Sequence, residues 1–381
     1  MTAAAGGPAD ERIMTVSERS PHALASRLET WLAGRLGAAA RPVVSGVRIQ
    51  RTSGLSSISV LFEADWTDTG TGSRRSGGYV ARLAPEAAAI PVFPHYDLAL
   101  QFDVIGQVAA RSPVPVPPLR WNETDPAPLG SPFFVMDQVD GLIPLDNPPY
   151  VFAGWLPEAA PADRARLERA SIEILAQVHA IADPVTAFPG LRPPEGVDTL
   201  RRHVDEQRAY YLWALAGDGI QVPIIERGLD WLSRHWPDEH GPDVLSWGDA
   251  RIGNIVYRDF TPVAVLDWEM AALGPRELDV AWFIFLHRFF QDLARTYGLP
   301  GLPDLLRRAD VERHYQEVSG QPLRNLDFYL VYAALRHAIV MARVKRRMIH
   351  FGEDQVPGDP DDYVLHRASL EHLLDGTYRW D

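Results

Sequence analysis

A short β-type stretch, residues 244–268, interrupts a series of long helical patterns and constrains the fold more than any other part of the sequence. Within it an apolar run ends in Gly248-Asp249, and a second apolar run follows Asn254. A third apolar run ends in Asp267. Because strands joined by short loops pair side by side, we expect a hairpin that brings these three oxygen-bearing side chains to one end.

These side chains suit a magnesium-dependent reaction. Magnesium prefers hard oxygen ligands and is held by one or two protein carboxylates beside the phosphates of a nucleotide. A separate carboxylate is then needed to accept or orient the proton of an attacking hydroxyl. We assign Asp249 to that second role, and Asn254 and Asp267 to the metal. Taken singly, each residue is more typical of an ordinary loop, so the prediction depends on their spacing and on the flanking strands.

The period of the apolar residues changes near Pro161. Before it, short alternating runs typical of strands dominate, with one helix beginning near Ser20 and another near Asp97. After it, the 3.6-residue period of helices dominates. The expected strands are residues 43–51, 58–66, 79–83, 119–122 and 133–139. The expected later helices are residues 161–181, 199–215, 224–236, 277–297, 310–318, 326–349 and 361–374.

Composition narrows the class of protein. The 381 residues carry a formal net charge of -13, which argues against nucleic acid as the main partner because phosphate backbones require a basic face. No run is long and apolar enough for a membrane helix or a signal core, and cysteine is absent, so a cytoplasmic enzyme is expected. Lys345 is the only lysine, so a cation that binds phosphate must be an arginine or that residue.

With these motifs the chain resembles the aminoglycoside phosphotransferase and choline kinase family, small-molecule kinases of the protein-kinase-like fold. The spacing of Asp249 and Asn254 is similar to the kinase catalytic loop. Asp267 stands in the Asp-Trp-Glu sequence of the family, as the main magnesium ligand. Residues 274–279 resemble its Gly-x-Pro-x-x-Asp element, one residue shorter, in which Asp279 would brace the catalytic loop by hydrogen bonds.

The resemblance implies an α+β class and a bilobal protein-kinase-like fold, with a small β-rich N-lobe and a larger helical C-lobe. Residues 1–19 would be a flexible N-terminus, residues 20–139 the N-lobe, and residues 140–381 the C-lobe with the catalytic loop and the acceptor site. ATP would bind between the lobes, under the loop that contains Ser53, Gly54, Ser56 and Ser57.

Further nucleotide contacts follow from the same resemblance. Arg82 would hold the α- and β-phosphates, because the family places a basic residue there. Its usual acidic partner aligns with Gln101, with Asp103 nearby. The connector that includes Asp137 and Val139 would bind adenine through its backbone.

The implied function is an ATP- and magnesium-dependent transfer of the γ-phosphoryl group to a hydroxyl of a small molecule. The sequence does not identify that acceptor, the oligomeric state or a role in antibiotic resistance. A hydroxyacyl thioester or another apolar alcohol is an open alternative to an aminoglycoside, because aromatic residues gather around Trp282. A nucleotide-binding pseudokinase is another alternative, because Trp247 stands where the family commonly has His and Gln101 replaces an acid. A non-enzymatic protein-interaction module is the last.

Overall fold

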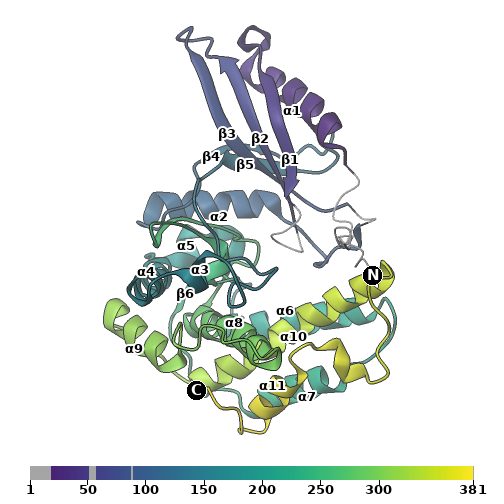
Figure 1. The fold of residues 1–381 in the computed structure, drawn as a ribbon, viewed down its shortest axis with the longest axis vertical. Helices are drawn as coiled ribbons and strands as arrows, with labels where there is room; N and C mark the ends of the chain where they lie inside the picture. The colour runs from purple at the N-terminus through teal and green to yellow at the C-terminus, as the bar shows by residue number, and fades with distance from the viewer. Residues whose placement is uncertain (1–18, 51–56, 87–88, 381) are drawn as a thin grey trace, which may run out of the picture.

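A five-stranded antiparallel sheet forms the upper lobe of the molecule (Figure 1). The computed structural model describes residues 19–50, 57–86 and 89–380. In the sheet the strand order is β1-β2-β3-β5-β4, and two helices, α1 (Pro21–Leu36) and α2 (Leu98–Arg111), pack with it. The strands are β1 (Val43–Gln50), β2 (Ile58–Thr67), β3 (Arg74–Leu83), β4 (Leu119–Glu123) and β5 (Phe133–Asp137).

The two faces of this sheet have different partners. Because successive side chains of a strand point to opposite faces, Phe133 and Val135 of β5 pack in the core that α1 completes. The alternate residue Phe134 joins the core that α2 and the lower lobe share. In β3 the same alternation buries Ala81 beneath α1 and leaves Arg82 on the side of the cleft between the lobes.

The lower lobe is helical and is organised around α10, which contacts α6, α7, α8 and α11. Helix α10 is buried on most of its circumference, as expected for a helix in the centre of a lobe. The helices are α3 (Trp155–Glu158), α4 (Pro161–His179), α5 (Pro184–Ala187), α6 (Thr199–Leu215), α7 (Pro223–Arg234), α8 (Glu277–Thr296), α9 (Arg308–Ser319), α10 (Leu326–His350) and α11 (Arg367–Leu374). Within the described ranges, no helix has the length and apolar character needed to cross a bilayer.

Two small two-stranded sheets lie among these helices. Strand β6 (Asp243–Ser246) pairs with β9 (Ala272–Pro275), and β7 (Ile255–Arg258) pairs with β8 (Thr261–Val265). The single hairpin expected over residues 244–268 is therefore wrong in part. Only β7 and β8 form a hairpin, whereas the strand that leads to Asp249 pairs with β9, which the sequence did not predict. The loop between β6 and β7 is too long for a tight turn, so β6 finds its partner elsewhere.

Three other element boundaries differ from expectation. Strand β3 begins at Arg74 rather than at residue 79, because the Asp68 side chain closes a short turn and allows Thr67 to pair with Arg74. Strand β5 ends at Asp137 rather than at residue 139. The helix expected over residues 361–374 is divided into a 3-10 turn, Pro360–Tyr363, and α11. The lobe boundary at residues 139 and 140 stays a prediction.

Candidate active site

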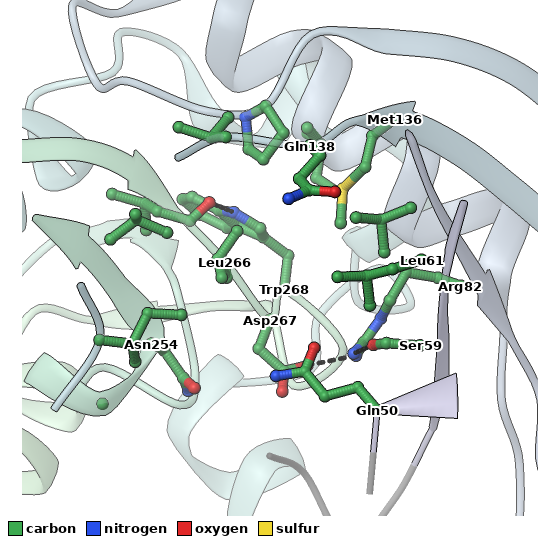
Figure 2. A pocket seen from close by; sticks show the side chains of 18 of the residues that line it. Gln50, Ser59, Leu61, Arg82, Met136, Gln138, Asn254, Leu266, Asp267 and Trp268 are labelled. Atoms are coloured by element: carbon green, nitrogen blue, oxygen red, sulfur yellow. Dashed lines mark hydrogen bonds and ion pairs between the residues drawn. The ribbon is translucent and has the colours of Figure 1, made fainter. Parts of the chain in front are cut away.

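A cleft lies between the sheet and the helical lobe, and residues far apart in the sequence line it together. Figure 2 shows Ser59 and Arg82 from the sheet facing Asn254 and Asp267 from the β7–β8 region. The connector residues Asp137 and Val139 line the same cleft. The structure therefore brings together the predicted metal ligands, the predicted phosphate cation and the predicted adenine-binding segment.

Asp249 follows β6 and is held by three donors. Its Oδ2 accepts hydrogen bonds from Arg251 Nε at 3.0 Å and from Asn254 Nδ2 at 2.6 Å. Its Oδ1 accepts one from Trp282 Nε1 at 2.8 Å. Burial opposes ionisation, but the charge of Arg251 and the three donated bonds outweigh it and hold the pKa of Asp249 below its ordinary value. Asp249 is therefore a fixed, ionised carboxylate.

Gly248 is required directly before that aspartate. Its φ is 93°, in the region that favours glycine, and a Cβ atom there would lie 2.0 Å from the carbonyl oxygen of Met270. The Gly-Asp pair thus allows the chain to turn sharply against the segment that follows Asp267.

Asp267 follows β8 and forms an ion pair across the cleft. Its Oδ1 lies 3.0 Å from Arg82 Nη2, while Arg82 Nη1 donates to Ser59 Oγ at 2.9 Å. Asp267 has a φ of 61°, a left-handed conformation that is uncommon for a residue with a side chain and is concentrated at functional sites. Burial raises the pKa of Asp267 above its ordinary value. The charge of Arg82 opposes this rise, and the smaller effect of the Asp249 charge adds to it.

The partner of Arg82 is not the one that the sequence suggested. Gln101 is buried at the cleft, but Asp103 is exposed on the far side of α2, so neither supplies a carboxylate to Arg82. Lys345 forms an ion pair with Asp354 in the helical lobe, so it is not the cation beside the sheet. Arg82 therefore takes Asp267 as its counter-charge.

Asp279, at the start of α8, joins the catalytic loop to the helices. Its carboxylate is completely buried and accepts hydrogen bonds from Ser246 Oγ at 2.7 Å, Trp247 N at 2.6 Å and Gly248 N at 2.9 Å. His179 of α4 contacts the same carboxylate at 3.1 Å. The bracing role predicted for Asp279 thus matches its contacts, which fix the backbone immediately before Asp249.

Replacing Asp279 by Asn is expected to lower the free energy of unfolding by about 3–5 kcal/mol, because an amide N–H would face either Trp247 N–H or Gly248 N–H in a dry site. Urea denaturation measures this change. The control is Asp375→Asn, which removes an exposed ion pair with Arg227 and should change the free energy by less than about 1 kcal/mol. Equal effects of the two substitutions would contradict the bracing role.

Trp247 provides a second brace. Its indole is fully buried, packs 5.8 Å from Trp268 between ring centroids, and donates from Nε1 to the carbonyl oxygen of Leu266 at 2.9 Å. Leu266 directly precedes Asp267, so Trp247 ties the two halves of the candidate site together. The departure from His at this position therefore keeps both packing and a hydrogen bond.

We expect Trp247→Phe to lower the free energy of unfolding by about 1–3 kcal/mol, because it leaves the Leu266 carbonyl without its donor. A tenfold or larger loss of kcat should accompany this change, about 1.4 kcal/mol in the barrier, since Asp267 loses its support. Thermal unfolding and steady-state kinetics measure the two effects. Trp213→Phe, on the surface of α6, should leave kcat unchanged, and an equal loss there would argue against a local cause.

The connector between the lobes is fixed by its backbone. Asp137 N donates to Pro118 O, and Gln138 N donates to Gly78 O, both at 2.9 Å. The Asp137 carboxylate is held by Arg120 Nε and Nη2 at 2.5 Å each, so this side chain serves the sheet. Adenine binding by the backbone of Asp137 and Val139 stays a prediction.

Of the predicted phosphate loop, only Ser57 lies among the described residues. Ser53, Gly54 and Ser56 lie outside the described residues. Ser57 is buried at the start of β2, and its hydroxyl has no hydrogen-bond partner among the described residues. Contact of Ser57 with phosphate stays a prediction.

Sequence reasoning missed two residues around Asp249. Arg251 lies in the catalytic loop and binds Asp146 through Nη1, at 2.6 and 2.7 Å, as well as Asp249. Its position between Asp249 and Asn254 could have indicated a cation beside the catalytic aspartate, because nearly all basic side chains that could serve there are arginines in a chain with one lysine. Trp282 contacts Asp249 from α8, and no local spacing connects the two residues.

Three comparisons with known proteins bear on the family and the fold of the chain. Residues 66–310 match the model of the phosphotransferase enzyme family. A probable acyl-CoA dehydrogenase, IBR3, of Arabidopsis thaliana is 27% identical over 65% of this chain and 31% of its own length. Acyl-CoA dehydrogenase family member 11 of Homo sapiens is 30% identical over 60% of this chain and 29% of its own. The chain thus spans about a third of the length of these relatives.

Solved structures share the fold. One, from Ralstonia eutropha JMP134, has a TM-score of 0.61 at 18% identity and covers 92% of this chain and 97% of its own. Another is aminoglycoside phosphotransferase APH(4)-Ia in a ternary complex with AMP-PNP and hygromycin B, with a TM-score of 0.55 at 16% identity, covering 92% and 98%. The α+β, bilobal, protein-kinase-like fold expected from the sequence is thereby confirmed.

Proposed function

Because the chain belongs to the phosphotransferase enzyme family, we propose that it transfers the γ-phosphoryl group of ATP to a hydroxyl of a small molecule. The observation that carries this proposal is the meeting of Asn254, Asp267 and Arg82 in one cleft, with Asp249 bonded to Asn254 beside it. Asp249 orients or deprotonates the acceptor hydroxyl, and its ionised state near neutral pH suits that role. Catalysis of this kind depends mainly on positioning and on neutralisation of charge.

The residues present fit a magnesium ion. Asn254 uses its Nδ2 for Asp249 O and Oδ2, which leaves its carbonyl oxygen as the atom that can bind a metal. Asp267 adds a carboxylate on the same cleft, and carboxylate oxygens are ligands that magnesium prefers. The described residues contain no cluster of three or more His, Cys, Asp or Glu, so the remaining ligands would come from phosphates and water. Magnesium, when bound, supplies neutralisation of phosphate charge.

The nucleotide would lie along the cleft, with adenine at the connector of Asp137 and Val139. Arg82 would then exchange its pair with Asp267 for the α- and β-phosphates, because a guanidinium binds two oxygens at once. The loop of Ser53, Gly54, Ser56 and Ser57 would cover the phosphates from the sheet. This arrangement makes Arg82 a contact of both the metal site and the nucleotide.

An apolar alcohol, including a hydroxyacyl thioester, is a second candidate acceptor beside the aminoglycosides of the family. It is favoured by the relatives named as acyl-CoA dehydrogenases and by the aromatic residues of α8, including Trp282 at Asp249. A pseudokinase, which binds the nucleotide with little transfer, is the alternative that the complete set of Asp249, Asn254 and Asp267 opposes.

The test is release of ADP from Mg-ATP across a panel of hydroxyl-bearing metabolites, hydroxyacyl thioesters and aminoglycosides, with Asp249→Ala as the blank. We expect at least one acceptor to stimulate ADP release in the native chain and not in the variant, with the phosphorylated acceptor detected by mass. Tight nucleotide binding without any acceptor-dependent release would favour a pseudokinase. Failure to bind nucleotide would contradict the kinase function altogether.

A further inference from the structure

An arginine without a counter-charge lies beneath the catalytic residues. Arg336, in α10, is only 2% exposed, yet its described surroundings contain neither a carboxylate bonded to it nor a hydrogen-bond acceptor for its Nε. Arg346, further along the same helix, is also buried, but it forms an ion pair with Asp218 at 2.8 Å and donates to Ile220 O at 2.6 Å. A buried, unpaired charge is unfavourable, so Arg336 requires an explanation that Arg346 does not.

Arg336 is connected to the catalytic aspartate through one aromatic ring. Its guanidinium lies 4.4 Å from the centre of the Trp282 ring, and the Nε1 of that indole donates to Asp249 Oδ1 at 2.8 Å. The contacts therefore run from α10 through α8 to the catalytic loop. Arg336 is not among the residues that line the cleft between the lobes, so it lies outside the proposed nucleotide site.

The hydrogen bonds of Asp249 indicate where an acceptor hydroxyl must approach. A carboxylate oxygen can accept about two hydrogen bonds. Oδ2 already has two, from Arg251 and Asn254, whereas Oδ1 has one, from Trp282. The open position is therefore on Oδ1, and a hydroxyl bound there would lie near the Trp282 indole, on whose ring Arg336 stacks.

We propose that Arg336 binds an anionic oxygen group of the phosphoryl acceptor, so that the acceptor is an alcohol that carries a carboxylate or a phosphate close to its reacting hydroxyl. This proposal rests on the phosphotransferase function. A guanidinium stacked on an aromatic ring is well suited to bind two oxygens of such a group. A polycationic acceptor would instead place like charges together.

The alternative is that Arg336 only balances distant acids. Burial lowers its pKa, and the carboxylates of Asp249 and Asp279 oppose that shift from a distance. Both aspartates are already bonded to other donors, three at Asp249 and four at Asp279. A purely structural role would affect every acceptor equally, whereas recognition of an anion affects only acceptors that carry one.

The experiment compares matched acceptors in the full chain with Mg-ATP. The pairs are 3-hydroxybutanoate with 3-hydroxybutanamide and glycerol 3-phosphate with glycerol, with hydroxycarboxylates of other chain lengths beside their amides. In the native chain we expect kcat/KM of the anionic member to exceed that of its neutral partner by about 30-fold or more in at least one pair. The carboxylate and phosphate pairs identify which anion is used.

Arg336→Met should reduce that ratio to about one, mainly through a higher KM for the anionic member, while the neutral member changes by less than about threefold. Arg336→Lys should restore part of the ratio, because it keeps the charge without the planar fork. Arg346→Met is the matched control for removing a buried arginine from α10. It should lower the melting temperature and leave the ratio unchanged.

Two kinetic results would overturn the proposal: equal use of anionic and neutral acceptors by the native chain, or an equal loss for both in Arg336→Met. If no acceptor of either kind is phosphorylated in an Asp249-dependent way, the phosphotransferase function itself fails. Calorimetric titration of the same alcohols into the Mg-ADP complex then decides the present proposal. Binding of an anionic alcohol that weakens about 30-fold in Arg336→Met supports it, and absence of such a difference rejects it.

Discussion

Asp249→Asn is expected to lower kcat about a thousandfold, within the range of about 10²–10⁴ that a positioned general base contributes. An amide cannot remove the proton, and either of its orientations sets N–H against a donor, Trp282 on one side or Asn254 and Arg251 on the other. KM for ATP should change little, because Asp249 is not among the residues that line the nucleotide cleft.

The same carboxylate predicts the pH dependence of the native chain. Because the pKa of Asp249 lies below its ordinary value, kcat should show no acidic limb from this group above about pH 4. Rapid-quench measurement of the transfer step separates this from product release. If Asp249→Asn keeps more than a tenth of the native kcat, a group other than Asp249 takes the proton.

Acidification is expected to destabilise the fold well before carboxylates titrate. Burial lowers the pKa of His203 to about 3 and the pKa of both His287 and His366 to about 4. Unfolded histidine titrates near 6.5, so below that pH the unfolded chain binds protons that the native chain refuses, and stability falls as pH falls. Each residue should remove about 2 kcal/mol between pH 7.5 and 5.0, or about 6 kcal/mol for the three.

That loss is comparable to the whole free energy of unfolding of a typical domain, about 5–15 kcal/mol. Burial raises the pKa values of Asp267 and Glu168, so their protonation stabilises the native chain as pH falls. Their ordinary pKa values are lower than that of histidine, so this stabilisation begins at a lower pH. Urea denaturation at pH 7.5, 6.0 and 5.0 measures the net effect. His366→Gln keeps a donor for Ala334 O and cannot be protonated, so it should remove about 2 kcal/mol of the loss between pH 7.5 and 5.0. An unchanged slope would show that His366 titrates normally.

Much of the fold and of the candidate site could be predicted from sequence, because the information is local. Arg82 was expected, from the family resemblance, as the cation in the third strand, and the structure has it on the cleft. The spacing of Asp249 and Asn254 reflects one loop, and their side chains bond at 2.6 Å. Asp279 was expected to brace that loop, and its carboxylate accepts the bonds of Trp247 N and Gly248 N.

Other features could not be predicted, because they join segments that the sequence separates widely. Ion pairing of Arg82 with Asp267 spans 185 positions and takes the place of a carboxylate at Gln101 of α2. Pairing of β6 with β9 was missed because a hairpin intervenes between them. In both cases the partner is close in space and distant in sequence: Asp267 for the charge of Arg82, and β9 for the edge of β6.

The sequence by itself predicted the chemical groups of the candidate site: an aspartate in a loop with kinase-like spacing, two oxygen-bearing side chains suited to a metal, and an arginine as the cation for phosphate. The tertiary structure alone decided how α8 and α10 complete the site. Trp282 reaches Asp249, and Arg336 lies under Trp282 without a counter-charge, only because the two helices pack together. Helix packing is set by the fit of many apolar side chains, so neither contact has a sequence pattern of its own.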